Sequence, residues 1–248
     1  LLALAFCAAG SMAGAQSSAS DHIALGDREH AAMNAAAALK HYDAAVAADP
    51  KSYEALWKAA RDAVDEGEGE PNAARRTQLY KEAEMYARRA VEARPNDAEG
   101  HFHLARALGR NALTLGKRDR VKYAGDVRAQ ALEALKYDPK HPGALHVMGV
   151  WNAEVMRLSG FTRMIARNFL GGKVFDSASW PEAVRYMEQA VAVDSGRITH
   201  HLDLGKIYAD VGDKAKARAQ FETVLRMPAR EPNDEMYKKD AEKALKGL

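Results

Sequence analysis

The sequence predicts an all-α fold, a tetratricopeptide-repeat helical solenoid of about five helix pairs with insertions between paired helices and a C-terminal capping helix. Three observations support this fold class. Apolar residues recur with the helical period in the long segments. One pattern of small and large residues returns along the chain. The composition, 47% hydrophobic and 28% charged over 248 residues, is that of an ordinary globular protein.

The repeated pattern marks the second helix of each unit. An Ala or Val is followed four residues later by an apolar residue, then by a small residue and an ending such as Asp-Pro. This spacing matches the second helix of a tetratricopeptide repeat. The positions expected to allow close helix approach are Ala45, Ala90, Ala134 and Ala190. The side chains expected to fill the groove between helices are Tyr42, Met187 and Phe221.

First helices precede these segments and complete the units. We expect Gly205 to lie where two helices cross too closely for a side chain. Three units exceed the ~34-residue period, which predicts insertions on one side of the solenoid. The repeat domain is predicted over residues 19–248, with units at about 19–52, 53–97, 98–141, 142–197 and 198–231 and a capping helix at 233–246.

The N-terminal segment predicts an export signal. It has no charged residue before Asp21, and its apolar run ends in the small-x-small sequence Ala13-Gly14-Ala15. The run is shorter than the ~20 apolar residues that span a membrane. We expect residues 1–15 to be a signal peptide and the mature protein to be periplasmic or secreted. Lipidation at Cys7 and an uncleaved anchor remain alternatives.

Charge and motif content favour a non-catalytic protein. The net charge of +2 argues against a nucleic-acid partner. The sequence contains no phosphate loop, dinucleotide fingerprint, nucleophile elbow or His-Glu-x-x-His pair. His101 and His103 are two positions apart, a spacing that points them in different directions on a helix. We therefore expect no catalytic residue, no cofactor and no metal site, and we expect the acidic run DEGEGE to be a solvated loop.

The first helices should line the concave surface of the solenoid and form a partner-binding groove. Aromatic and guanidinium groups together suit a carboxylate or phosphate, so a protein or peptide partner with anionic groups is expected. A solvated basic face without a ligand is the alternative. The predicted groove residues are Trp57, Lys58, Arg61, Phe102, His103, Arg106, Arg110 and His146.

The insertion at 157–175 is both apolar and basic. Phe161, Ile165 and Phe169 are spaced as a helical stripe, and Arg157 and Arg167 are among its basic residues. Three interpretations are open. The insertion could be a flap packed on the solenoid, a contact with a lipid or membrane surface, or a contact with a partner protein.

Four motifs follow one another between residues 144 and 169. They are Ala144-Leu145-His146, Gly149-x-Trp151, Leu158-Ser159 with Phe161, and Ala166 to Phe169. These motifs resemble those of the regulator of microtubule dynamics family. The resemblance covers roughly residues 50–245 and includes the insertion. It implies a helical repeat domain that associates with proteins or microtubules. Phospholipid binding and transfer is attributed to one animal member of the family.

These observations together predict a non-catalytic protein-binding or scaffold module that holds a peptide or protein in its concave groove. The alternative is a phospholipid-binding or lipid-transfer protein that uses the groove and the insertion 157–175. No nucleic-acid partner is expected.

Overall fold

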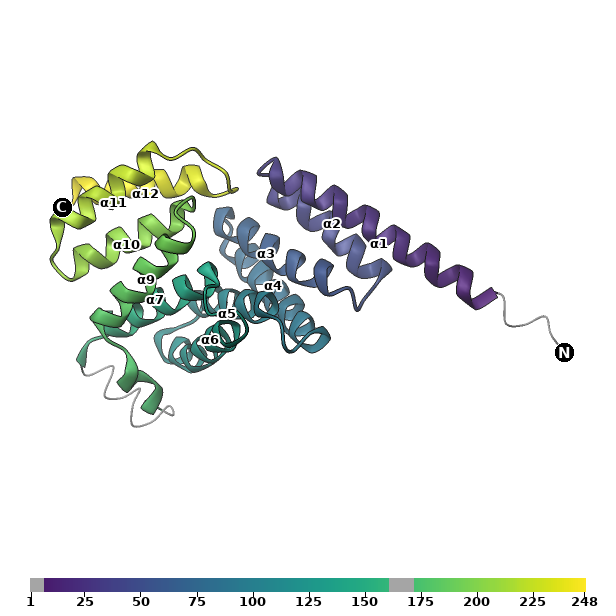
Figure 1. The fold of residues 1–248 in the computed structure, drawn as a ribbon, viewed down its shortest axis with the longest axis horizontal. Helices are drawn as coiled ribbons and strands as arrows, with labels where there is room; N and C mark the ends of the chain where they lie inside the picture. Colours follow the sequence, from purple (N-terminus) through teal and green to yellow (C-terminus); the bar gives the residue numbers. More distant parts are fainter. Residues whose placement is uncertain (1–6, 161–171) are drawn as a thin grey trace.

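The computed structural model describes residues 7–160 and 172–248. In chain order its elements are α1 (Cys7–Ala31), α2 (Ala35–Ala48), α3 (Tyr53–Gly69), α4 (Ala73–Ala93), α5 (Ala98–Leu113), α6 (Lys117–Tyr137), α7 (Pro142–Arg157), the 3-10 helix η1 (Gly172–Ser177), α9 (Trp180–Val193), α10 (Ile198–Asp210), α11 (Lys214–Arg226) and α12 (Asp234–Lys246). Within these described residues no strand is formed (Figure 1). The predicted all-α class is confirmed.

The helices pack as consecutive pairs. Helix α1 packs on α2, α3 on α4, α5 on α6, α7 on α9, and α10 on α11, while α12 packs on both α10 and α11. Most second helices begin at a capping side chain that accepts a hydrogen bond from the first turn, such as Asn34, Asn72 or Ser179. Stacked helix pairs of this kind form the predicted solenoid (Figure 1).

Helix α1 is longer than the helix expected for a first repeat unit. It begins at Cys7 and continues through Ala15, the expected cleavage position, to Ala31. The signal peptide at residues 1–15 stays a prediction. Across the described ranges 7–160 and 172–248, no helix is both long and apolar enough to cross a bilayer.

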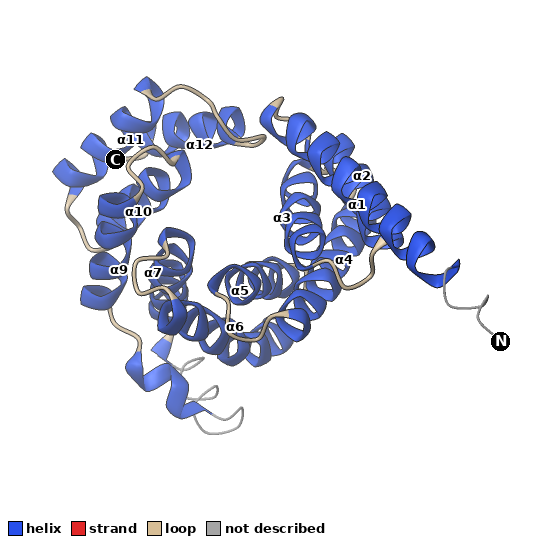
Figure 2. Cartoon of the chain, turned by 45° about the vertical axis from the view of Figure 1, so that its right-hand side comes forward, coloured by secondary structure: helices blue, strands red, loops and turns tan. Residues whose placement is uncertain are grey.

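The stack curves until its two ends meet. In Figure 2 the helices surround a central space, with α3, α5 and α7 facing it and α4, α6 and α9 outside. The ring is closed between α12 and α3: the Asn233 side chain donates a hydrogen bond to the Asp65 carbonyl at 2.8 Å. This contact joins residues 168 positions apart. The solenoid is therefore a closed ring and not an open arc.

Close helix approach determines the small residues of the core. Ala45, Ala90, Ala134 and Ala190 have no exposed surface, as the repeat pattern predicted. A Cβ atom added to Gly205 would lie 2.5 Å from Cε1 of the Phe221 ring, so two helices do cross there without room for a side chain. The same separation relates Gly26 to Tyr42 and Gly67 to Tyr80. Three helix glycines in this chain therefore pack directly against an aromatic ring.

Replacing Gly205 with alanine should lower the free energy of unfolding by roughly 1–3 kcal/mol, the scale of overpacking in a full core. The matched control is Gly109→Ala in α5, where an added Cβ meets nothing within 4 Å. That change should be neutral or stabilising by up to about 1 kcal/mol, because alanine has the higher helix propensity. Urea unfolding of both variants measures the difference, and equal midpoints would contradict the assigned crossing.

Candidate functional site: a central cavity with a polar rim

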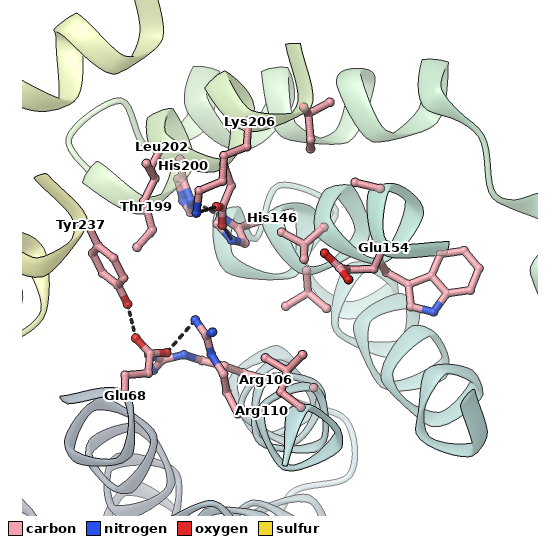
Figure 3. A pocket seen from close by; sticks show the side chains of 18 of the residues that line it. Glu68, Arg106, Arg110, His146, Glu154, Thr199, His200, Leu202, Lys206 and Tyr237 are labelled. Atoms are coloured by element: carbon pink, nitrogen blue, oxygen red, sulfur yellow. Dashed lines mark hydrogen bonds and ion pairs between the residues drawn. The ribbon is translucent and has the colours of Figure 1, made fainter. Parts of the chain in front are cut away.

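A cavity of about 850 Å³ lies inside the ring. Its walls come mainly from α5, α7, α10 and α12. Apolar side chains cover part of the wall, among them Val147, Val150 and Leu202. Charged and imidazole side chains face the same space, as Figure 3 shows for Arg106 and His146. The volume is in the range of pockets that hold small ligands.

Glu68 is the centre of the polar network at one side of the cavity. Its carboxylate is 3.2 Å from Arg106 and 2.7 Å from Arg110. The same carboxylate accepts hydrogen bonds from the Tyr237 hydroxyl (Figure 3) and from the Asn233 amide. Only 3% of the Glu68 side chain is exposed, so these four partners replace water.

The arginines of this network stay charged. Burial alone would lower the pKa of Arg106, but the carboxylates of Asp65 and Glu68 raise it above its usual value. Burial opposes the charge of Arg110 in the same way, and Glu68 again raises the pKa. The cavity wall therefore carries paired charges, with little net charge available to an incoming ion.

Three predicted groove residues lie away from the cavity. Lys58 is buried and contacts Asp27 at 2.7 Å and Glu54 at 2.6 Å. Arg61 donates to Asp62 at 2.8 Å. Its guanidinium also lies over Trp57, 5.5 Å from the ring centroid. These groups form a structural cluster between the first and second helix pairs, and the cavity lining does not include them.

His103 is also a core residue and does not line the cavity. Its ring stacks on Trp57 with centroids 5.3 Å apart, and its Nε2 atom is 3.3 Å from Glu99. Glu99 is 3.4 Å from His141 as well. Burial alone would raise the pKa of Glu99. The contacts with His103 and His141 together outweigh this effect, so the pKa of Glu99 lies below its usual value. Burial lowers the pKa of His103 to about 4.

The predicted groove residues that do line the cavity are Phe102, Arg106, Arg110 and His146. Sequence reasoning missed the acids that pair with the arginines. Asp62, Asp65 and Glu68 follow one another at three-residue spacing, which places them along one side of α3. The run that begins at Asp65 was expected to be a solvated loop. That expectation is wrong, because α3 continues to Gly69 and buries Asp65.

A second polar cluster lies across the cavity. Nδ1 of His146 is 2.8 Å from Nδ1 of His200 (Figure 3), and Nε2 of His146 is 3.1 Å from Asp203. Nε2 of His200 is buried and has no hydrogen-bond partner in the described structure. Burial lowers the pKa of His200 well below its usual value, and His146 lowers it further. The His200 ring is therefore neutral near pH 7.

The insertion is described only at its edges. Arg157, in the last turn of α7, lines the cavity and pairs with Glu154 at 2.5 Å and with Asp210. It is therefore part of the solenoid wall. The other predicted flap residues, Phe161, Ile165, Arg167 and Phe169, lie outside the described residues, and their role stays a prediction.

Comparison with known proteins decides the family. Residues 19–248 match the family described as Regulator of microtubule dynamics protein 1-3. The chain belongs to this family. The Regulator of microtubule dynamics protein 1 of Mus musculus is 25% identical over 197 residues, which is 79% of this chain and 64% of the relative. For the Bos taurus protein the identity is 25% over 198 residues, 79% of this chain and 62% of the relative. The chain thus spans a little under two thirds of these relatives.

Solved structures show the same fold as this member of the regulator of microtubule dynamics family. A thermophilic TPR protein of Thermus thermophilus aligns with a TM-score of 0.67 at 19% identity, covering 92% of this chain and 98% of that one. The pilF protein of Pseudomonas aeruginosa aligns with a TM-score of 0.51 at 14% identity, covering 94% and 90%. The predicted tetratricopeptide solenoid is therefore confirmed.

The residues on which the family resemblance rests have distinct places in α7. Gly149 faces Met187, whose nearest side-chain atom would lie 3.1 Å from an added Cβ. Trp151 is buried, and its indole N–H donates to the Ala124 carbonyl at 2.7 Å. His146 reaches the cavity. Gly149 thus serves packing alone in this family member, whereas His146 and Trp151 both line the cavity.

Proposed function

We propose that this protein is a non-catalytic interaction module that holds a segment of a partner protein in its central cavity. The observation that carries the proposal is the 850 Å³ cavity itself, which combines apolar walls with fixed polar groups. Such a surface can bury apolar side chains and still satisfy the polar groups of a bound chain. The membership of a tetratricopeptide family fits a role in protein interaction.

The paired charges of the cavity wall indicate which kind of partner segment can bind. Arg106 and Arg110 share Glu68, and Arg157 has its own carboxylate partners. An anionic partner would have to displace these carboxylates, which are already close to ideal distances. The proposal is therefore for an uncharged or mixed polar and apolar segment, and strong selectivity for anions is not part of it.

Filling the cavity should abolish binding without unfolding the protein. Gly109 lines the cavity, and an added Cβ there meets nothing within 4 Å, so Gly109→Phe should place a ring in open space. Gly125 in α6 is equally unobstructed and does not line the cavity, so Gly125→Phe is the matched control. Partners captured by the parent protein would be identified by mass spectrometry. We expect Gly109→Phe to lose them and Gly125→Phe to keep them.

A result in which both variants capture the same partners would place the binding surface outside the cavity.

Microtubules are one partner to test directly, because the relatives are named regulators of microtubule dynamics. Co-sedimentation of the parent and both variants with microtubules would show whether such an association uses the cavity.

A phospholipid is the second candidate occupant. The apolar wall around Val147, Val150 and Leu202 could hold acyl chains, and the apolar and basic insertion could contact a membrane. Extraction of a fluorescent phospholipid from vesicles would test this function. Loss of extraction in Gly109→Phe, with peptide binding absent in the parent, would favour lipid over a protein segment.

A further inference from the structure

Three residues near the ring closure direct polar atoms at one point. His30 lies in the last turn of α1, and Asp62 and Asp65 lie on α3. One potential ligand atom from each residue lies within 4.8 Å of the other two. Nδ1 of His30 is 2.8 Å from Oδ1 of Asp62. This cluster lies beside the contact between α3 and the segment before α12, and it is separate from the His146 pair.

The other polar atom of each residue is held from outside the cluster. Oδ2 of Asp62 accepts from Nε of Arg61 at 2.8 Å. Oδ1 of Asp65 accepts from Arg106 at 2.5 Å. Nε2 of His30 is 3.8 Å from the carboxylate of Glu231, in the loop between α11 and α12. These hydrogen bonds fix the orientation of Asp62 and Asp65, and the carboxylate of Glu231 lies near the outer nitrogen of His30.

One inward atom has no partner. Asp65 is buried, and its Oδ2 atom has no hydrogen bond within the described structure. An unpaired carboxylate oxygen in a buried position is costly, so native proteins seldom leave one without a ligand, water or ion. The unpaired oxygen of Asp65 therefore indicates a missing ligand, and this evidence does not depend on the short distances within the cluster.

We propose that His30, Asp62 and Asp65 bind one divalent transition-metal ion, with Zn²⁺ as the best match and water completing the coordination. Imidazole nitrogen and carboxylate oxygen are both zinc ligands. Metal-bound histidines donate their second N–H to a carboxylate, and metal-bound carboxylates are hydrogen-bonded in turn. Glu231, Arg61 and Arg106 occupy these outer positions.

The proposed ion would replace the hydrogen bond between His30 and Asp62. In the metal-free protein, the 2.8 Å contact is satisfied when Nδ1 of His30 donates to Asp62. Metal binding needs the lone pair of Nδ1, so the bound imidazole is the tautomer whose single N–H is on Nε2, facing Glu231. The nearby guanidinium groups reduce the negative charge of the site, which makes affinity moderate. The ion would connect α1 to α3. This inference does not rest on the proposed function of the cavity.

The first test uses the tag-free full chain after treatment with EDTA. Isothermal titration with Zn²⁺ should give one ion per chain. Mn²⁺ should bind more weakly, and Mg²⁺ more weakly still because it prefers oxygen ligands and retains its waters. Zn²⁺ should also raise the melting temperature, because it binds the folded chain. A parent protein without a one-to-one Zn²⁺ isotherm would overturn the proposal.

The second test places the ion. His30→Gln and Asp65→Asn should each weaken Zn²⁺ binding at least tenfold, the scale on which metal-site variants act. His41→Gln, on α2 and outside the cluster, is the control and should bind as the parent does. Circular dichroism without metal checks that each variant is folded. Because His30 is partly exposed, its replacement tests the site even if Asp65→Asn fails to fold. Parental affinity in His30→Gln would assign any bound zinc to other histidines and refute the site.

Discussion

Replacing Glu68 with alanine is expected to lower the free energy of unfolding by about 3–5 kcal/mol, the cost of breaking a buried ion pair. The substitution leaves Arg106 and Arg110 facing each other without their shared carboxylate. It also removes the acceptor of Tyr237, so one of the contacts that close the ring is lost. Urea unfolding measures the stability. Small-angle X-ray scattering should detect a larger radius of gyration if the ring opens.

The matched control is Glu66→Ala, two positions earlier on the same helix. Glu66 is 3.5 Å from Arg75, whose side chain is 41% exposed. A solvent-exposed pair of this kind contributes about 0–1 kcal/mol. If the two alanine variants unfold at the same urea concentration, Glu68 is not the centre of a stabilising network.

Acidification from pH 7 to pH 4 should destabilise the protein, because two of its buried histidines resist protonation in the folded state. Burial lowers the pKa of His103 to about 4 from a usual value of 6.5. Between these values the unfolded chain binds a proton that the folded protein does not bind, so stability is full above pH 6.5 and falls as the pH drops. At about 1.4 kcal/mol per pKa unit, His103 alone accounts for roughly 3 kcal/mol at pH 4. His200, whose pKa is also lowered by burial, acts in the same direction.

Urea midpoints measured from pH 7 to pH 4 test this expectation. His103→Phe removes the titrating group and keeps a ring against Trp57, so its stability should change less with pH than that of the parent. Parallel curves for the parent and His103→Phe would show that His103 does not couple protonation to folding.

The regular part of the fold follows from local spacing. Ala45 and Ala190 are fully buried. Each lies three residues after a groove-filling side chain, Tyr42 or Met187, and this spacing can be recognised in the sequence. Gly205 could be placed at a helix crossing for the same reason. The closure of the ring is different. It depends on curvature summed over all helix pairs, and no local pattern connects Asn233 with Asp65.

The cavity was partly predictable. Repeat register placed Arg106, Arg110 and His146 on the first helices that line it. Their partners were missed because the acidic run beginning at Asp65 contains glycines and was expected to form a loop. The three-residue spacing of Asp62, Asp65 and Glu68 was the available signal. Lys58 and Arg61 could not be assigned from register alone, because nearby carboxylates draw both side chains into the core.

The bond between Tyr237 and Glu68 bears on how the chain is completed during synthesis. Its partners are 169 positions apart, so the acceptor is made long before the donor. Repeats in an open array can form one after another as they leave the ribosome, since each contacts only its neighbours. Here Glu68 and its arginines are synthesised before Tyr237, so their network stays incomplete until α12 has been translated. Nascent chains that stop before residue 233 should therefore resist proteolysis less well around α3 than the finished protein, although every residue of α3 is already present.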